Sequence, residues 1–225
     1  MKFKLTENKK EIDGITLFQI QYLKSFANIN DGDLGGWIEK ECNLSQDGDA
    51  HVYGNACVYG DAFVYGDAHV YGDTRVYGNA HVSGDTYVYG DAWVSGNALV
   101  FGNARVYGNA HAYGNAHVFG DTYVYGKAHV YGDARVFGDA RVYGDARVYG
   151  DAHNISPLYI QGTRNSLTLC SKNHIAIGCQ INSFKEWLEQ FEQIGKENEY
   201  TAEQIIEYKN HIDYIIQCSK NYFNN

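Results

Sequence analysis

Residues 48–71 read GDAHVYGNACVYGDAFVYGDAHVY, and this stretch decides the fold of the chain. The unit Gly–Asp/Asn–Ala–x–Val–Tyr recurs every six residues, and glycine fills its position eighteen times without a gap, from Gly48 to Gly150. Valine fills its position sixteen times, from Val52 to Val148, with Ala112 the one interior exception, and the small position is always Ala or Thr. Because Ala and Val alternate with x, they share one side of a short strand and predict a narrow apolar interior.

The Gly–Asp/Asn pair supplies a bend between successive strands. Glycine reaches positive φ without steric cost, and Asp or Asn can hydrogen-bond the nearby backbone. Strands this short cannot pair usefully in hairpins, but they can form a coil in which each strand pairs with its equivalent one turn later. The repeat therefore predicts a β-solenoid over residues 48–153, which ends where Asn154 takes the valine position.

The repeat resembles the hexapeptide-repeat superfamily, whose members form a left-handed parallel β-helix of triangular section. The pairs Val52/Ala50 and Val58/Ala56 match the inward aliphatic and small positions of that family. The resemblance implies three hexads per coil, and hence six coils of 18 residues, and it alone implies the left hand. The segments GDLGGWIEK, IQGTRNSLTL and IAIGC also resemble those of phage and prophage hexapeptide-repeat proteins, which carry the labels putative acyltransferase and polymer-forming protein.

Both ends of the repeat carry sequence suited to covering an open solenoid. Residues 1–47 predict an N-terminal β cap, with a strand and turn at Ile15–Phe26 and with Trp37 and Ile38 over the open end. Residues 154–182 predict a β segment, because PLYIQG, SLTLC and HIAIG alternate as strands do. Residues 183–225 predict a helical hairpin, since capping boxes begin at Ser183 and Thr201. The inward faces are Phe184, Trp187, Leu188, Phe191 and Ile194 on the first helix, and Ile205, Tyr208, Ile212, Ile215 and Ile216 on the second.

Composition and charge narrow the functional classes. The net charge of −9 argues against direct nucleic-acid binding and against adhesion to an anionic membrane surface. No apolar run approaches the roughly 18 residues that a membrane span needs. The N-terminal MKFKLTENKKEIDG lacks the apolar stretch of a secretion signal, so we expect a cytoplasmic protein. The five cysteines form no CxxC pair, which favours free thiols.

Three hexads per turn arrange the x residues in three outward columns. These are His51, His69, Tyr87, Arg105, Tyr123 and Arg141; then Cys57, Arg75, Trp93, His111, His129 and Arg147; then Phe63, His81, Leu99, His117, Arg135 and His153. Arg135, Arg141 and Arg147 fall on three different faces, so no phosphate-binding stripe is expected. The pairs His51/His69 and His111/His129 are rung neighbours, but no carboxylate or thiol joins them at the same position, so we expect polar stacking and no metal.

The same arithmetic lines up the bend residues on three corners. One corner holds Asp49, Asp67, Asp85, Asn103, Asp121 and Asp139; the next holds Asn55, Asp73, Asp91, Asn109, Lys127 and Asp145; the third holds Asp61, Asn79, Asn97, Asn115, Asp133 and Asp151. The first corner is either a row of good bend residues or an acidic edge that mimics a nucleic-acid backbone. Beside it runs a tyrosine column, which serves either rung-to-rung stacking or partner binding: Tyr53, Tyr71, Tyr89, Tyr107, Tyr125 and Tyr143.

The preferred hypothesis is a non-catalytic, phage-type binding protein that presents the acidic edge of Asp49, Asp67, Asp85, Asp121 and Asp139 beside the tyrosine column. The partner would be a protein, such as a host or defence protein that binds nucleic acid, and the protein described here would inhibit it. Trp187, Phe191, Tyr208 and Tyr214 would give a second contact or a homo-oligomer.

Two alternatives from other classes remain. One is an acyltransferase that uses acyl-CoA, as the resemblance implies, and the other is a self-assembling scaffold. No loop leaves the repeat between Gly48 and Ala152, and each histidine in it occupies a routine outward position. We therefore expect no pocket around a histidine, no catalytic residue and no cofactor.

Overall fold

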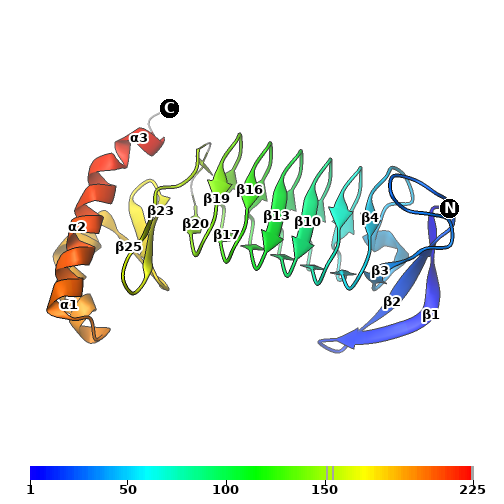
Figure 1. The fold of residues 1–225 in the computed structure, drawn as a ribbon, viewed down its shortest axis with the longest axis horizontal. Coiled ribbons are helices and arrows are strands. Elements are labelled where there is room, and N and C mark those ends of the chain that lie inside the picture. The colour runs from blue at the N-terminus through cyan, green and yellow to red at the C-terminus, as the bar shows by residue number, and fades with distance from the viewer. Residues whose placement is uncertain (151, 154, 224–225) are drawn as a thin grey trace.

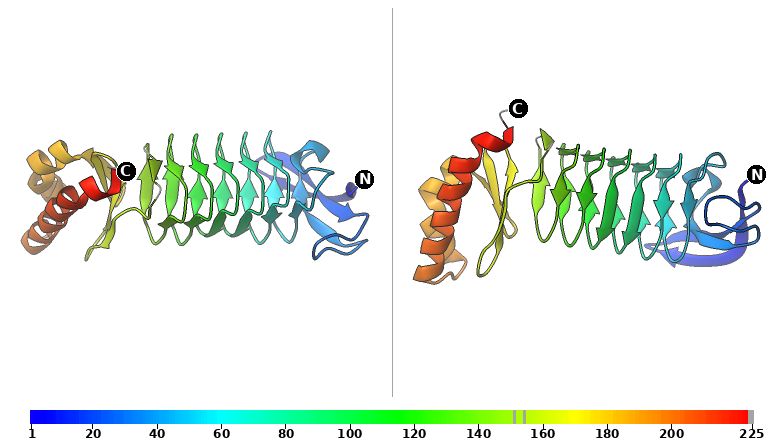
Figure 2. Two further views of the ribbon diagram at one scale, coloured as in Figure 1. Left: turned by 90° about the horizontal axis from the view of Figure 1, so that it is seen from above. Right: turned by 45° about the horizontal axis from the view of Figure 1, so that its top comes forward.

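The computed structural model describes residues 1–150, 152–153 and 155–223, which form an elongated rod with a β hairpin at its N-terminal end and helices at its C-terminal end (Figure 1). Asp151 and Asn154, where the sequence predicts a bend and the end of the repeat, lie outside the described residues. The stacked coils form the middle of the rod in every view (Figure 2).

Three parallel sheets run along the rod, one for each side of the coil, and each contains every third strand. The first contains β4 (His51–Val52), β7 (His69–Val70), β10 (Tyr87–Gly90), β13 (Arg105–Gly108), β16 (Tyr123–Val124) and β19 (Arg141–Val142). The second contains β5 (Cys57–Val58), β8 (Arg75–Val76), β11 (Trp93–Val94), β14 (His111–Ala112), β17 (His129–Tyr131) and β20 (Arg147–Tyr149). The third contains β6 (Phe63–Val64), β9 (His81–Val82), β12 (Leu99–Val100), β15 (His117–Val118), β18 (Arg135–Val136) and β21 (Ala152–His153).

The coil closes after 18 residues, as the sequence predicts. Tyr87 pairs with Arg105 and Val88 with Val106, and stacked bend residues such as Asn55 and Asp73 also lie 18 apart. Every repeat valine from position 52 to position 148 is fully buried, as is Ala112. The predicted fold class is therefore confirmed: a mainly β solenoid of about six coils between an N-terminal β cap and a C-terminal cap of strands and two main helices.

The glycine corners are where the coils approach one another most closely. The repeat glycines all have positive φ, from 64° to 83°. At Gly84 (φ 73°) an added Cβ would lie 2.7 Å from the carbonyl oxygen of Gly102 one coil later. Glycine is therefore required there twice over, by the backbone conformation and by the space between rungs.

The N-terminal cap continues the solenoid before Gly48. It consists of β1 (Phe3–Ile12), β2 (Ile15–Tyr22), β3 (Leu34–Ile38) and a short 3-10 helix at Glu41–Asn43. β1 and β2 form an antiparallel hairpin, which the sequence analysis did not predict beyond a strand at residue 15. β3 pairs in parallel with β5, so that Ile38 lies beside Val58 and supplies one more apolar rung.

Side chains satisfy the exposed backbone of the first coil, where a strand edge would otherwise be open. The Tyr22 hydroxyl donates to the Val52 carbonyl (2.8 Å) and accepts from the Val52 N–H (2.9 Å). The buried Lys2 ammonium donates to the Ala50 carbonyl (2.7 Å). Asn43 Nδ2 donates to the carbonyls of Gly60 (3.0 Å) and Ala62 (2.9 Å). These groups terminate the ladders and leave little backbone for a second rod to pair with.

The C-terminal cap is a four-stranded antiparallel sheet covered by helices. Its elements are β22 (Tyr159–Gln161), β23 (Ser166–Ser171), β24 (His174–Ile177), β25 (Gln180–Ser183), α1 (Phe184–Glu197), α2 (Ala202–Cys218) and α3 (Lys220–Phe223). Both capping boxes form, with Ser183 accepting from Glu186 and Thr201 from Gln204. The predicted inward position of Leu188 is wrong, because this side chain is 48% exposed at the edge of the apolar face of α1. β25 was not predicted.

The repeat slips by one residue in the last coil. β21 pairs with β18 so that Ala152 lies beside Arg135 and His153 beside Val136. The predicted outward position of His153 is therefore wrong: its side chain is only 2% exposed, and its Nε2 lies 3.2 Å from the Cys170 carbonyl oxygen of the cap. A one-residue shift turns every side chain of a strand to the other face, which explains the change.

Within the described residues, none of the helices combines the length and the apolar character needed to cross a membrane.

We predict that Gly84→Ala destabilises the protein by more than Gly14→Ala. Both glycines have a similar positive φ, 73° and 79°, but an added Cβ at Gly14 meets nothing within 4 Å. The Gly14 variant should lose only the conformational cost of about 1–2 kcal/mol. The Gly84 variant should lose a further ~1–3 kcal/mol of unfolding free energy by overpacking. Urea unfolding followed by circular dichroism measures both; equal losses would contradict the close stacking of the corners.

Candidate functional site

The outer surface of the first solenoid sheet (β4, β7, β10, β13, β16, β19) carries the two rows that the sequence singled out. Within one hexad, Asp49, His51 and Tyr53 alternate with the inward Ala50 and Val52, so all three point outward from one sheet. The acidic edge thus runs along one side of this surface, the tyrosine column runs along the other, and the x residues lie between them. We call this surface the tyrosine face.

The tyrosine column forms a continuous stack of rings. Successive centroids from Tyr53 to Tyr143 lie 4.8–5.7 Å apart, with interplanar angles of 20° or less. Tyr159 of the cap extends the stack at 5.6 Å. The end rings are the more exposed, with Tyr53 at 38% and Tyr143 at 40%. Burial raises the pKa of the Tyr71, Tyr89 and Tyr107 hydroxyls, so these groups stay neutral.

The acidic edge differs from the third corner in its hydrogen bonds, and it resembles the second corner, where one such bond is also recorded, from Asn55 to Asp73. On the third corner, Asn79, Asn97 and Asn115 form a ladder that ends on Asp133, with side-chain bonds of 2.9–3.0 Å. On the acidic edge one such bond is recorded, from Asn103 to Asp121 (2.8 Å), while Asp67 accepts from the Asp49 backbone N–H (3.3 Å). Aspartates stacked on aspartates cannot form the amide ladder.

The middle row of the tyrosine face is not uniformly acidic or aromatic. The Arg105 guanidinium lies between the rings of Tyr87 and Tyr123, 5.4 and 5.3 Å from their centroids, and Arg141 lies 5.5 Å from Tyr123. This row therefore carries cations at Arg105 and Arg141, and its earlier positions hold His69 and Tyr87. The columns drawn from the sequence contained these arginines, but their stacking on tyrosine was not foreseen.

The rings of the two histidine pairs are in contact but are not stacked: His51 and His69 meet edge-on (72° between planes), and His111 and His129 are tilted (35°). The rings of His51 and His69 lie 4.3 Å apart and those of His111 and His129 lie 4.8 Å apart. No group of three or more His, Cys, Asp or Glu residues within the described chain could hold a metal ion. His51 keeps its predicted outward register beside His69, but the N-terminal cap with Phe26 covers it and leaves it fully buried. Burial lowers the pKa of His51.

The expectation that no histidine lines a pocket is wrong for His129. This residue lines a cleft of about 410 Å³ together with Lys127, Asp145 and Arg147 of the solenoid and with residues of the cap. Sequence reasoning missed the cleft because its other wall comes from the loop that joins β22 and β23, including Arg164, and from the loop after β24. The unusual bend residue Lys127 was the only signal of it in the repeat.

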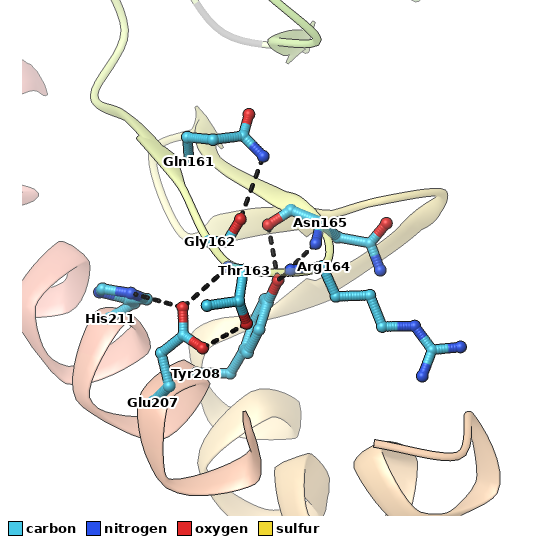
Figure 3. Close-up of polar contacts among 8 residues, drawn as sticks. All are labelled: Gln161, Gly162, Thr163, Arg164, Asn165, Glu207, Tyr208 and His211. Atoms are coloured by element: carbon cyan, nitrogen blue, oxygen red, sulfur yellow. Dashed lines mark hydrogen bonds and ion pairs between the residues drawn. The ribbon is translucent and has the colours of Figure 1, made fainter. Parts of the chain in front are cut away.

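Hydrogen bonds to α2 fix the cap wall of the cleft (Figure 3). The Tyr208 hydroxyl donates to the Asn165 carbonyl (2.7 Å) and accepts from the Arg164 N–H (3.1 Å). Glu207 accepts from the backbone N–H and from the hydroxyl of Thr163, at 2.9 and 2.6 Å. The loop therefore has a defined conformation, and Arg164 is one of its residues that line the cleft.

The four residues predicted to make a second contact at the C-terminal end differ in how deeply they are buried. Trp187 (3% exposed) and Tyr208 (5%) lie in the core of the cap, and Trp187 Nε1 donates to the Ile175 carbonyl (2.8 Å). Phe191 packs half-buried against the same core and also lines a small cavity of about 100 Å³. Tyr214 is 53% exposed. A second contact through these helices is thus left mainly to Tyr214.

Comparison with known families supports the repeat architecture. The family model described as YdcK Beta solenoid repeat matches residues 92–108, 98–114, 128–144 and 140–153. No curated protein matches the chain. Together with the stacked coils, the match shows that the chain is a solenoid repeat protein.

We predict that acidification destabilises the fold partly through His129. Burial, and then the neighbouring His111 and Arg147, lower the pKa of His129 from 6.5 to about 4. Between these values the unfolded chain binds a proton that the folded chain does not, so stability falls as the pH is lowered from 6.5 towards 4. Urea unfolding over this range should show a smaller loss in His129→Gln than in the wild type or in His117→Gln, a control outside the cleft. Equal losses in all three proteins would contradict the prediction.

Proposed function

We propose that the protein is a non-catalytic binding protein that contacts a protein partner through the tyrosine face. The observation that carries the proposal is the acidic edge itself. The third corner demonstrates that asparagines serve as bend residues and add a hydrogen-bonded ladder between rungs. Asp49, Asp67 and Asp85 cannot form that ladder. Their carboxylates instead repel one another by up to about 1 kcal/mol per exposed pair in water. The fold therefore does not require the negative charge of these aspartates, and a protein partner with a basic surface would bind to it.

The tyrosine column supports the proposal as a source of affinity. Its rings are held parallel at 4.8–5.7 Å before any partner arrives, so binding would immobilise few additional side chains. Tyrosine combines a large apolar ring with a hydroxyl that donates and accepts, and it is enriched among the residues that dominate interfaces. The part of the face around Asp67 and Tyr71 lies farther from Arg141 than the part around Asp121 and Tyr125, and Arg105 borders it at Tyr87.

The chemistry of the face indicates a partner with a basic, elongated binding surface. Carboxylates in a line at the spacing of the coils, about 4.8 Å, offer a series of negative charges that a nucleic-acid-binding groove can accept in place of phosphates. The resemblance to phage and prophage proteins favours a host or defence protein as the partner and inhibition as the result.

The two alternative functions have weaker support. An acyltransferase would use a histidine as general base in a pocket, and His129 does line a cleft, but the solenoid extends no loop over it and Nδ1 of His129 is buried without a partner among the described residues. A self-assembling scaffold would stack rods end to end, whereas Tyr22, Lys2 and Asn43 occupy the backbone of the first coil.

We predict that the double charge reversal Asp67→Lys/Asp85→Lys abolishes capture of the partner. Immobilised wild-type protein should retain nucleic-acid-binding proteins from a bacterial lysate, and added duplex DNA should compete for them. The matched control is Asp73→Lys/Asp91→Lys, which makes the same charge change in the same two coils on the next corner, and it should retain capture. Capture that survives the first reversal, or that is lost equally in both variants, would exclude the acidic edge.

A second pair of variants separates the tyrosine column from the charge. Ser83 and Ser95 fill the tyrosine position elsewhere in the repeat, so serine is compatible with the coil. Tyr71→Ser/Tyr89→Ser should weaken capture by at least about tenfold, as the loss of two interface anchors does. Tyr113→Ser/Tyr131→Ser removes a stacked pair from another corner (5.1 Å) and should not. Equal capture by both variants would assign the column to stability alone.

A further inference from the structure

The cleft between the last coils and the cap concentrates positive charge in a chain whose net charge is −9. Lys127, Arg147 and Arg164 line it, and Asp145 is the one carboxylate among its lining residues. None of the ion pairs recorded within the described chain involves any of these three cations. Three cations in one cleft repel one another, so the site favours an anion from outside.

The fold does not require the positive charge of Lys127. Seventeen of the eighteen bend positions hold Asp or Asn, and Lys127 is the single exception. Its neighbours one coil before and after are Asn109 and Asp145. An asparagine at position 127 could form the ladder seen on the third corner, where Asn115 donates to Asp133 at 2.9 Å. Of the two bend residues that line the cleft, Asp145 follows the rule of the repeat and Lys127 departs from it.

The two arginines are held in place by different parts of the fold. The backbone N–H of Arg147 donates to Thr168 Oγ1 of β23 (3.2 Å), which ties the solenoid wall to the cap. Nη1 of Arg164 donates to the Glu199 carbonyl (2.8 Å), and its guanidinium lies 4.7 Å from the Tyr200 ring centroid. A guanidinium has five N–H groups, so Arg164 retains donors beyond this bond. The backbone of Arg147 and the guanidinium of Arg164 are therefore held in place before a ligand binds.

His129 adds a neutral polar ring to the same wall. Its ring lies 4.8 Å from that of His111 and is tilted by 35°, and Nδ1 is buried without a partner among the described residues. Because the imidazole is neutral near neutral pH, it can offer one N–H and one acceptor. Since Nδ1 is buried, a ligand in the cleft can bind only the other ring nitrogen, which donates or accepts according to the tautomer.

We propose that this cleft binds a small phosphate-bearing ligand, with Lys127, Arg147 and Arg164 as the phosphate-binding residues. Guanidinium groups match phosphate oxygens in pairs, and an ammonium adds a compact charge. The volume of about 410 Å³ lies within the range of small-molecule sites, roughly 300–1,000 Å³. The site is on another side of the coil from the sheet of the tyrosine face, and it does not depend on the function proposed above.

Calorimetric titration with inorganic pyrophosphate tests the proposal. The wild type should bind pyrophosphate more tightly than citrate, which carries similar charge on carboxylates. Lys127→Asn should weaken pyrophosphate binding by about tenfold, as the loss of one charged hydrogen bond does. The same variant should unfold at the same temperature as the wild type or higher, because an asparagine at this bend restores the repeat. Arg164→Gln should also weaken binding, and the control Arg135→Gln, on another face, should not.

Three results would overturn the proposal. One is no pyrophosphate binding by the wild type, and another is equal binding of pyrophosphate and citrate. The third is binding that Lys127→Asn and Arg135→Gln leave equally intact. Since Lys127→Asn should not unfold the protein, loss of binding with an unchanged unfolding temperature assigns the effect to the cleft. Capture of a protein partner by the tyrosine face is measured separately, and its failure would leave these outcomes unaffected.

Discussion

One backbone hydrogen bond, repeated along the rod, positions every side chain on its surface. The N–H of Tyr53 donates to the Val70 carbonyl (3.0 Å), that of Tyr71 to Val88 (3.0 Å) and that of Tyr125 to Val142 (2.9 Å), seventeen residues later each time. Since the spacing of such ladders is fixed at about 4.8 Å, residues 18 apart must stack whatever their chemistry. The sequence can choose only what is stacked: tyrosine on tyrosine, asparagine on asparagine, or aspartate on aspartate.

That constraint explains which parts of the structure could be predicted. Inside the repeat, the glycine and valine positions set the register once, and the columns of Tyr53–Tyr143 and Asp49–Asp139 follow by counting. At the ends, no period sets the position of one segment against another. The hairpin of β1 and β2 was missed, although Asp13–Gly14 is a turn signal with positive φ at both residues. The hydrogen bonds from Lys2 to Ala50 and from Tyr22 to Val52 join residues 48 and 30 positions apart, so no local sequence pattern predicts them.

The two candidate sites differ in the same way, because one lies within the repeat and the other lies at its C-terminal end. The tyrosine face is periodic, so its geometry followed from the sequence, while its use by a partner did not. The cleft is aperiodic: the solenoid supplies Lys127, His129 and Arg147, and a loop fixed by Tyr208 and Glu207 supplies Arg164. The slip that buries His153 belongs to the same junction, where the last coil adapts to β23. The period of the repeat cannot predict how far the solenoid residues lie from the residues of the cap, because the packing of the last coil against the cap sets these distances.

Departures from the repeat therefore carry more information about function than the repeat does. A residue that obeys the rule, such as Asp91, needs no reason beyond the bend it forms. Lys127 breaks the rule, and it lines the same cleft as Arg147 and Arg164. Tyr159, outside the repeat, stacks on Tyr143 (5.6 Å), and its hydroxyl donates to Gln161 Oε1 (2.7 Å) at the rim of the cleft. This residue joins the end of the tyrosine column to the cleft wall, so the periodic surface and the aperiodic site meet at one side chain.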